Sequence, residues 1–299
     1  MTRPEPQEIC KNDRLEVAGI VRNSGSSFYW GMRFLHSQQR FAMYAIYAFC
    51  RILDDIVDGD SDKIALGSSS ENSSIDFQTL DFWKEEIQRI FSKEQCLTSI
   101  GRELAIAVQE YNLLKEDLWA LISGMEMDLN GPIFAPTCAE LDLYCARVAG
   151  VVGHLSTRVF GIPPKAGRVI AYHLGRALQL TNILRDVEPD SLSSRLYLPK
   201  ELLLKHQVPI DGQDIDQILS HPHIKLVCQE IYQQAFAHFK YADSCMNNFT
   251  KEQKRPMRFM AIMYKKILQK MEKRGLENFH KKVRLTKFEK IRLVLQQVF

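Results

Sequence analysis

The sequence predicts a protein built from α-helices alone and folded as one domain. Apolar residues recur at helical spacing along nearly all of the 299 residues, and no segment shows the alternating pattern of a half-buried strand. The chain is 45% hydrophobic and 25% charged, with few Gly or Pro, which is typical of a globular protein. No linker divides the chain into separate parts.

The helices follow from this periodicity and from capping residues. Ser37 is positioned to cap the first helix. Thr137 with Glu140, and Thr286 with Glu289, match the capping-box pattern and each open a helix. The predicted helices span about 37–58, 81–95, 99–114, 115–129, 137–164, 166–188, 225–248, 255–278 and 286–299.

Two segments lack helical periodicity. Residues 59–80 are Ser-rich and polar, which predicts a mobile loop. This loop either folds over whatever the preceding acidic residues bind or is a plain surface linker. Residues 189–225 include Pro199, Pro209 and Pro222, which predicts loop and short helix.

Charge and cysteine content exclude some classes of protein. No charge-free run approaches the ~18 apolar residues that span a bilayer. The polar start of the chain does not resemble a secretory signal. The seven cysteines form no CxxC pair, so we expect a reducing cytoplasm, with the inner face of the membrane as a second location.

Positive charge is concentrated at the C-terminal end. Residues 251–299 carry 15 Lys/Arg against 4 Asp/Glu, in a chain whose net charge is +3. Such a segment favours contact with phosphates, on a substrate or on an anionic membrane surface. The last predicted helix has an apolar stripe flanked by these basic residues, so it either lies on a membrane or packs on the bundle.

Three aspartates fall inside the first predicted helix, in the sequence YAFCRILDDIVD. One helix face carries four polar residues at spacings of four, three and four: Tyr47, Arg51, Asp54 and Asp58. Asp55 lies about 100° round the helix, on its flank. A buried helix therefore presents a pair of carboxylates on one face.

The same arrangement occurs once more, in GRALQLTNILRDVEPD. A second helix face carries five residues at spacings of four, three, four and four: Gly175, Gln179, Asn182, Asp186 and Asp190. Opposed acidic pairs without a counter-charge repel one another, so divalent cations between them would explain the pattern. Carboxylate oxygens suit Mg²⁺. The alternative is two exposed acidic faces with local Asp–Arg pairs.

Five segments are similar to segments of the squalene/phytoene synthase family, in the family's order and over nearly the whole chain. They are SSFYWGM at 26–32, YAIYAFCRILDDIVD at 44–58, YCARVAGVVGHL at 144–155, ALQLTNILRD at 177–186 and RLYLP at 195–199. The resemblance implies an isoprenoid-synthase-type helical bundle around a central cavity, formed by residues 1–299. It also implies a Mg²⁺-dependent prenyltransferase that condenses two prenyl diphosphates head to head.

The resemblance assigns roles to individual residues. The metal ligands are expected to be Asp54, Asp58, Asn182, Asp186 and Asp190. The residues that grip or approach the diphosphate are expected to be Tyr47, Arg51, Arg195 and Tyr264. The remaining residues of the substrate cavity are expected to be Ser27, Phe28 and Gln179.

The sequence departs from the family pattern at two places. Pro189 stands where the second acidic motif usually has Glu, and proline predicts that the helix ends or kinks near Glu188. Near the C-terminus, Lys281 and Lys282 stand where relatives often place an arginine for diphosphate. Lysine supplies charge without the bidentate fork of arginine.

The segments SSFYWGMR, GMEMDL and AELDLYC are most similar to the bacterial branch that makes presqualene diphosphate for squalene and hopanoids. We therefore expect two farnesyl diphosphates as substrates, presqualene diphosphate as product and no use of NADPH. Squalene-forming enzymes that use this product are candidate partners. Phytoene or dehydrosqualene synthesis remains an alternative, as does a non-catalytic helical assembly factor.

Overall fold

The computed structural model describes residues 6–59, 78–129, 131, 133–212, 214–280 and 282–298. Within these residues the chain is helical, without strands, and one isolated bridge joins Phe134 to Leu196. The predicted all-α class is therefore confirmed. The elements are α1 (Pro6–Asn23), α2 (Ser27–Met32), α3 (Ser37–Val57), α4 (Leu80–Ser92), α5 (Ser99–Tyr111), α6 (Lys115–Leu129), α7 (Cys138–Cys145), η2 (Ala146–Gly150), α8 (Val151–Val159), α9 (Pro164–Leu192), α10 (Lys200–Lys205), α11 (Ile215–Leu219), α12 (Ile224–Met246), α13 (Lys251–Arg274) and α14 (Lys287–Val298).

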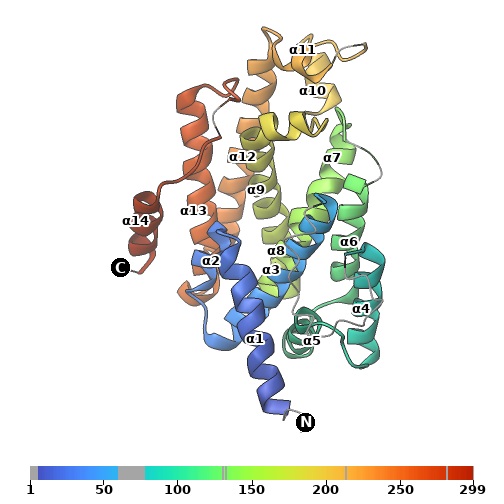
Figure 1. Cartoon of the computed structure of the whole chain (residues 1–299). Helices are drawn as coiled ribbons and strands as arrows, with labels where there is room; N and C mark the ends of the chain where they lie inside the picture. The colour runs from blue at the N-terminus through green and yellow to red at the C-terminus, as the bar shows by residue number, and fades with distance from the viewer. Residues whose placement is uncertain are drawn as a thin grey trace.

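The longest helix, α9, runs through the middle of the bundle (Figure 1). It packs against α8, α12, α13 and η2. The short helices α10 and α11 gather at one end of the bundle, and α14 lies at its edge beside α13 (Figure 1). No helix in the described part of the chain is both long and apolar enough to cross a bilayer.

Helix α9 continues past the point where the sequence predicts an end or a kink. It contains Pro189 and ends at Leu192, so the predicted end near Glu188 is wrong. Proline removes one backbone donor and strains the preceding turn. Here the Ser191 hydroxyl donates to the Glu188 carbonyl at 2.8 Å, which gives that acceptor a partner in the last turn. The acidic motif therefore stays on one continuous helix.

The helix predicted for 137–164 is interrupted. Thr137 and Glu140 form the expected capping box, which confirms the start of α7. Between α7 and α8, however, the segment η2 adopts the wider π-helical turn. Such turns are uncommon and occur frequently at functional sites.

The start of α3 also differs from the prediction. His36 occupies the N-cap position, Ser37 is already helical, and no side chain caps this helix. Helices α1 and α2 precede it, and no bounds were predicted for either helix. The second predicted capping box is confirmed, because Thr286 and Glu289 exchange hydrogen bonds at the start of α14. Residues 60–77 of the predicted mobile loop lie outside the described residues.

Two kinds of packing fix the helices that carry the acidic motifs. The back of α3 is apolar and buried, and its Phe49 ring meets Trp83 of α4 edge to face at 5.6 Å. Between α8 and α9 the backbones approach closely, since a Cβ at Gly153 would lie 3.0 Å from the Cα of Ala171. Glycine at position 153 is therefore explained by the close contact between α8 and α9.

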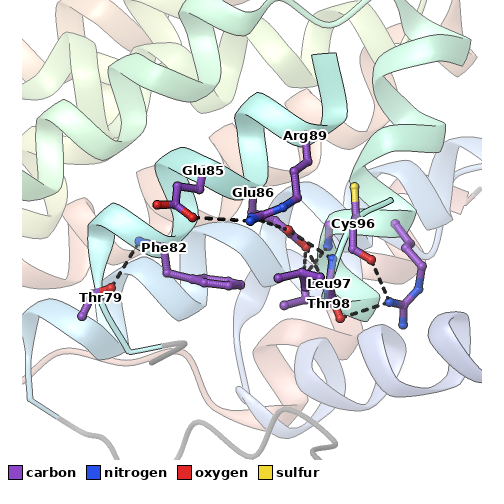
Figure 2. A network of polar contacts seen from close by, with 10 residues as sticks. Thr79, Phe82, Glu85, Glu86, Arg89, Cys96, Leu97 and Thr98 are labelled. Atoms are coloured by element: carbon purple, nitrogen blue, oxygen red, sulfur yellow. Dashed lines mark hydrogen bonds and ion pairs between the residues drawn. The ribbon is translucent and has the colours of Figure 1, made fainter. Parts of the chain in front are cut away.

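A buried carboxylate ties α4 to the start of α5 (Figure 2). Glu86 is fully buried and accepts hydrogen bonds from the backbone of Leu97 at 3.2 Å and of Thr98 at 2.8 Å. The Thr98 hydroxyl donates to Glu86 and accepts from the Gly101 backbone. Because a buried carboxylate without partners is costly, this set of bonds specifies one arrangement of the α4–α5 connection.

Gly101 leaves the space that Glu86 occupies. A Cβ at Gly101 would lie 2.2 Å from the Glu86 carboxylate oxygen, so Gly101→Ala must displace a buried, fully bonded group. We expect Gly101→Ala to lower the free energy of unfolding by about 2 kcal/mol, measured by urea denaturation. Gly19→Ala in α1 is the control, because nothing lies within 4 Å of its added Cβ. It should raise stability by about 0.5–1 kcal/mol, as alanine favours a helix. Equal effects of the two substitutions would contradict this account.

Candidate active site

A cavity of about 440 Å³ lies between α2, α3, α6, η2, α8, α9 and α13. Three of these helices present apolar residues first and a carboxylate near their C-terminal ends. In α6, Leu121 and Met125 precede Asp128, and in α9, Leu174 precedes Asp186. Because these ends meet, the cavity has an acidic end and an apolar remainder.

Every predicted site residue whose side chain is described lines this one cavity. The side chain of Ser27 lies outside the described residues, although its backbone opens α2. The predicted residues that the structure brings together are Phe28, Tyr47, Arg51, Asp54, Asp58, Gln179, Asn182, Asp186, Asp190, Arg195 and Tyr264.

The first acidic motif contains two kinds of aspartate. Asp55 is buried and pairs with Arg51, whose Nε donates to it at 3.1 Å and whose Nη2 also contacts it. Asp54 and Asp58 face the cavity instead. Asp58 lies 3.6 Å from Nη1 of Arg195. Arg51 is therefore engaged in a structural ion pair at the edge of the cavity.

The environment of Asp54 disfavours the charged form of its carboxyl group. Asp54 is exposed to solvent in the cavity, but the surrounding protein atoms desolvate it and raise its pKa to about 7, and the neighbouring carboxylates Asp58 and Asp128 add to the rise. Arg51 opposes it only in part. Asp54 is thus a carboxylate whose charged form lacks sufficient compensation from the protein.

In the second motif, Asp186 is well compensated. Burial favours its neutral form, but hydrogen bonds and charge from Arg185 and Lys282 outweigh this and lower its pKa. The Lys282 ammonium lies 2.8 Å from Asp186, which brings the C-terminal segment to the cavity. Lys281 lies outside the described residues.

Asp190 resembles Asp54 in its electrostatics. Burial raises the pKa of Asp190 to about 7, and repulsion from Asp186 adds to the rise, whereas Arg195 and Lys282 oppose it. The Asp190 carbonyl accepts a hydrogen bond from the Arg195 backbone at 2.8 Å. This turn holds Arg195 between the two motifs.

Asn182 provides a polar atom without a partner. Its Oδ1 is buried and accepts no hydrogen bond from the described residues, while its Nδ2 donates to Gln179 at 3.4 Å. Burial raises the pKa of the nearby Tyr264 hydroxyl, whereas Arg185 and Asn182 lower it. A buried amide oxygen that faces a cavity in this way is available to a ligand.

Aromatic rings close the side of the acidic end. The Phe28 ring lies 6.1 Å from that of Tyr47 and 6.4 Å from that of Tyr264, between centroids. Tyr47 donates its hydroxyl hydrogen bond to Ser24 at 3.1 Å. The two predicted tyrosines therefore lie on either side of Phe28.

The sequence prediction missed three residues of the site. Asp128 accepts hydrogen bonds from Tyr197 at 2.9 Å and from Tyr144 at 3.2 Å, and the two tyrosine rings stack. Burial raises the pKa of Asp128, although both hydroxyls and Arg195 oppose the rise. All three residues lie in segments similar to the family, GMEMDL, YCARVAG and RLYLP. Asp128 could have been found from the sequence, because it is an acidic residue that continues the apolar face of α6.

The comparisons with known proteins agree with this geometry. Residues 21–289 match the family model described as squalene/phytoene synthase. The presqualene diphosphate synthase of Zymomonas mobilis is 42% identical over 96% of this chain and 94% of its own. That of Rhodopseudomonas palustris is 40% identical over 91% and 92%. A phytoene synthase of Synechococcus elongatus is more distant, at 29% identity over 92% and 89%. A crystal structure of a dehydrosqualene synthase shares the fold, with a TM-score of 0.82, 22% identity and 98% coverage of both chains.

The helical bundle and its acidic cavity define an all-α isoprenoid-synthase fold. The chain belongs to the squalene/phytoene synthase family. This membership confirms the family predicted from the sequence and, with it, the class of enzyme, a prenyl-transferring synthase.

Adjacent aspartates in α3 should respond in opposite ways to loss of charge. Without metal, Asp54→Asn should raise the melting temperature at pH 8, because it removes a poorly compensated charge. Asp55→Asn should lower it, because it leaves Arg51 without its partner. The measurement is thermal unfolding in a chelating buffer.

The pH dependence gives a second readout of the same pair. A carboxyl with a raised folded pKa keeps its proton in the folded state after the unfolded chain has lost it. Stability of the metal-free protein should therefore fall as pH rises from about 4 to about 7, and Asp54→Asn should reduce this fall. An Asp54→Asn protein less stable than the original at pH 8 would contradict the electrostatic account.

Proposed function

We propose that this protein condenses two farnesyl diphosphates head to head to presqualene diphosphate, with release of diphosphate. The observation that carries the proposal is the single cavity in which two acidic motifs meet at one end of an apolar space. Identity of about 40% with presqualene diphosphate synthases over nearly full length supports this product over phytoene.

The cavity offers a separate environment to each part of such a substrate. A diphosphate fits the acidic end only with cations, and Arg195 and Lys282 already contact its carboxylates there. These side chains can exchange a carboxylate for a diphosphate oxygen as the substrate binds. A prenyl chain fits the remainder, which side chains such as Met43, Ile46 and Leu121 line.

The residues present fit Mg²⁺. The candidate donors are all oxygens, namely Asp54, Asp58, Asp186 and Asp190 together with the unpartnered Oδ1 of Asn182. In the described part of the chain, no three acidic, His or Cys side chains form a closed metal site. Mg²⁺ suits this arrangement, because it often binds through a few carboxylates and completes its shell with water and substrate phosphates.

The raised pKa values of Asp54 and Asp190 agree with a site completed by cations. Both carboxyls have to lose their protons to bind a metal ion, so binding is expected to release protons near neutral pH. Bound Mg²⁺ would neutralise the diphosphate and favour its departure as a leaving group.

The chain itself positions the two substrates and excludes water. Departure of the first diphosphate leaves an allylic cation, and the 2,3 double bond of the second molecule attacks it. Loss of one proton then closes a cyclopropane ring. The apolar walls keep water from the cation. The proton goes either to the released diphosphate or to a tyrosine such as Tyr47, and we propose no later reduction by NADPH.

Phytoene or dehydrosqualene synthesis is the second candidate, since the same cavity and motifs would serve either reaction. A non-catalytic assembly factor is the third. Both acidic motifs of this chain are complete and face the cavity, which favours catalysis over a purely structural role.

The product assay tests the proposal. With farnesyl diphosphate and Mg²⁺, we expect a C30 diphosphate by mass spectrometry, unchanged by NADPH and abolished by a chelator. Asp186→Ala should lower kcat about 100-fold or more, because charge stabilisation of several kcal/mol is lost. Asp81→Ala is the control, since Asp81 is exposed on α4. Detection of squalene, dehydrosqualene or a C40 product would contradict the proposed product. Absence of any turnover would favour the non-catalytic assembly factor.

We also propose that α14 contacts an anionic membrane surface. Phe288 and Ile291 are 84% and 48% exposed, next to the exposed basic residues Arg284 and Arg292. The helix also packs on α13, and Lys270 binds Glu289, so it presents an apolar edge while attached to the bundle. A membrane would receive the hydrophobic product, and squalene-forming enzymes there would be partners. The protein would then work at the inner face of a membrane or in the cytoplasm.

Co-sedimentation with vesicles containing anionic lipid tests this contact. Phe288→Glu should reduce binding several-fold, because it places a charge against the bilayer. Phe236→Glu is the matched control, since Phe236 is an exposed phenylalanine on α12. If neither change, or both changes equally, altered binding, α14 would not be the contact.

A further inference from the structure

The π-helical segment η2 forms part of the cavity wall. Its Val148 and Ala149 line the cavity that ends at the acidic motifs. Its Ala146 and Gly150 line a second, more open space of about 490 Å³. The segment η2 therefore lies between the two spaces and contributes residues to both.

Helix α9 holds this wall from one side through Gly175. A Cβ at Gly175 would lie 2.9 Å from the carbonyl carbon of Ala149 and 2.9 Å from the backbone nitrogen of Gly150. Backbone atoms cannot rotate away as a flexible side chain can. Gly175 therefore lets α9 touch the backbone of η2 directly.

Helix α6 holds the wall from another side through Gly124. A Cβ there would lie 2.9 Å from Cγ1 of Val148 and 3.1 Å from the Cβ of Arg147. The segment η2 thus has no room for a methyl group toward either helix at these positions. Gly150 itself differs, since the nearest atom to its added Cβ, the Cys145 carbonyl oxygen, is 3.7 Å away.

We propose that η2 determines the length of the prenyl chain that the cavity accepts, and that Gly175 is the residue that positions it. This inference rests on the proposed function. A methyl group at Gly175 occupies cavity space, because Gly175 also lines the cavity, and it displaces the backbone of η2. Because α6 already packs closely on η2 at Gly124, η2 cannot move toward α6 to make room for this methyl group.

The test compares chain lengths within one preparation. Turnover of geranyl, farnesyl and geranylgeranyl diphosphate is measured for each variant, and the ratios do not depend on the fraction of folded protein. Gly175→Ala should shift kcat/KM at least tenfold toward geranyl diphosphate relative to farnesyl diphosphate. Val148→Ala, which removes two methyl groups from the wall, should shift it toward geranylgeranyl diphosphate. Gly150→Ala is the matched control and should leave the ratios unchanged, because its methyl group makes only ordinary van der Waals contacts, at 3.7 Å or more.

Each outcome separates the inference from the proposed function. Turnover by the unaltered protein, with ratios within twofold of it in both Gly175→Ala and Val148→Ala, would overturn the inference and keep the function. A shift in Gly150→Ala as large as that in Gly175→Ala would also overturn it, because the contact with α9 would then not be the cause. If Gly175→Ala fails to fold, Val148→Ala alone decides. Absence of any prenyl turnover in the unaltered protein would remove the proposed function together with the inference.

Discussion

Repulsion between carboxylates at one end of the cavity is the constraint on which the site depends. Asp54, Asp58, Asp128 and Asp190 influence one another across three helices. The protein offsets this repulsion unevenly, because the pKa of Asp186 is lowered while those of Asp54 and Asp190 rise to about 7. Such an imbalance is costly in an empty site. Under the proposed function, metal ions and a diphosphate would offset it.

The rest of the bundle maintains that imbalance. If α3 could rotate or move outward, Asp54 and Asp58 would move away from the carboxylates of α6 and α9 and lose their influence on them. The Phe49–Trp83 contact anchors its buried side, and the bonded Glu86 carboxylate fixes the helices behind it. The Arg195 turn closes the end of α9 and provides a cation that both motifs share. The structure thus distinguishes Asp55, which pairs with Arg51, from Asp54, which faces the cavity.

Much of the site could be predicted because its residues recur at helical spacing. Tyr47, Arg51, Asp54 and Asp58 share a face of α3 in the structure as the spacing requires. The predicted end of the helix near Glu188 was wrong, because α9 continues through Pro189 to Leu192 and its packing in the bundle outweighs local propensity. The π-helical turn at η2 was not predicted, and its backbone packs closely on α9 at Gly175, a contact that periodicity along the chain does not reveal.

The sequence by itself determined the helical class, the two acidic faces and the family to which the chain belongs, because these depend on periodicity and on residues close together along the chain. Only the tertiary structure decided which charges pair with which. Arg51 forms an ion pair with Asp55, and Lys282 forms one with Asp186. Two tyrosine hydroxyls donate hydrogen bonds to Asp128. The tertiary structure also placed η2 between α6 and α9. The Arg51–Asp55 pair joins neighbouring turns of α3, but the other contacts join segments far apart in the chain. Their energies depend on burial and distance, which spacing along one helix cannot specify.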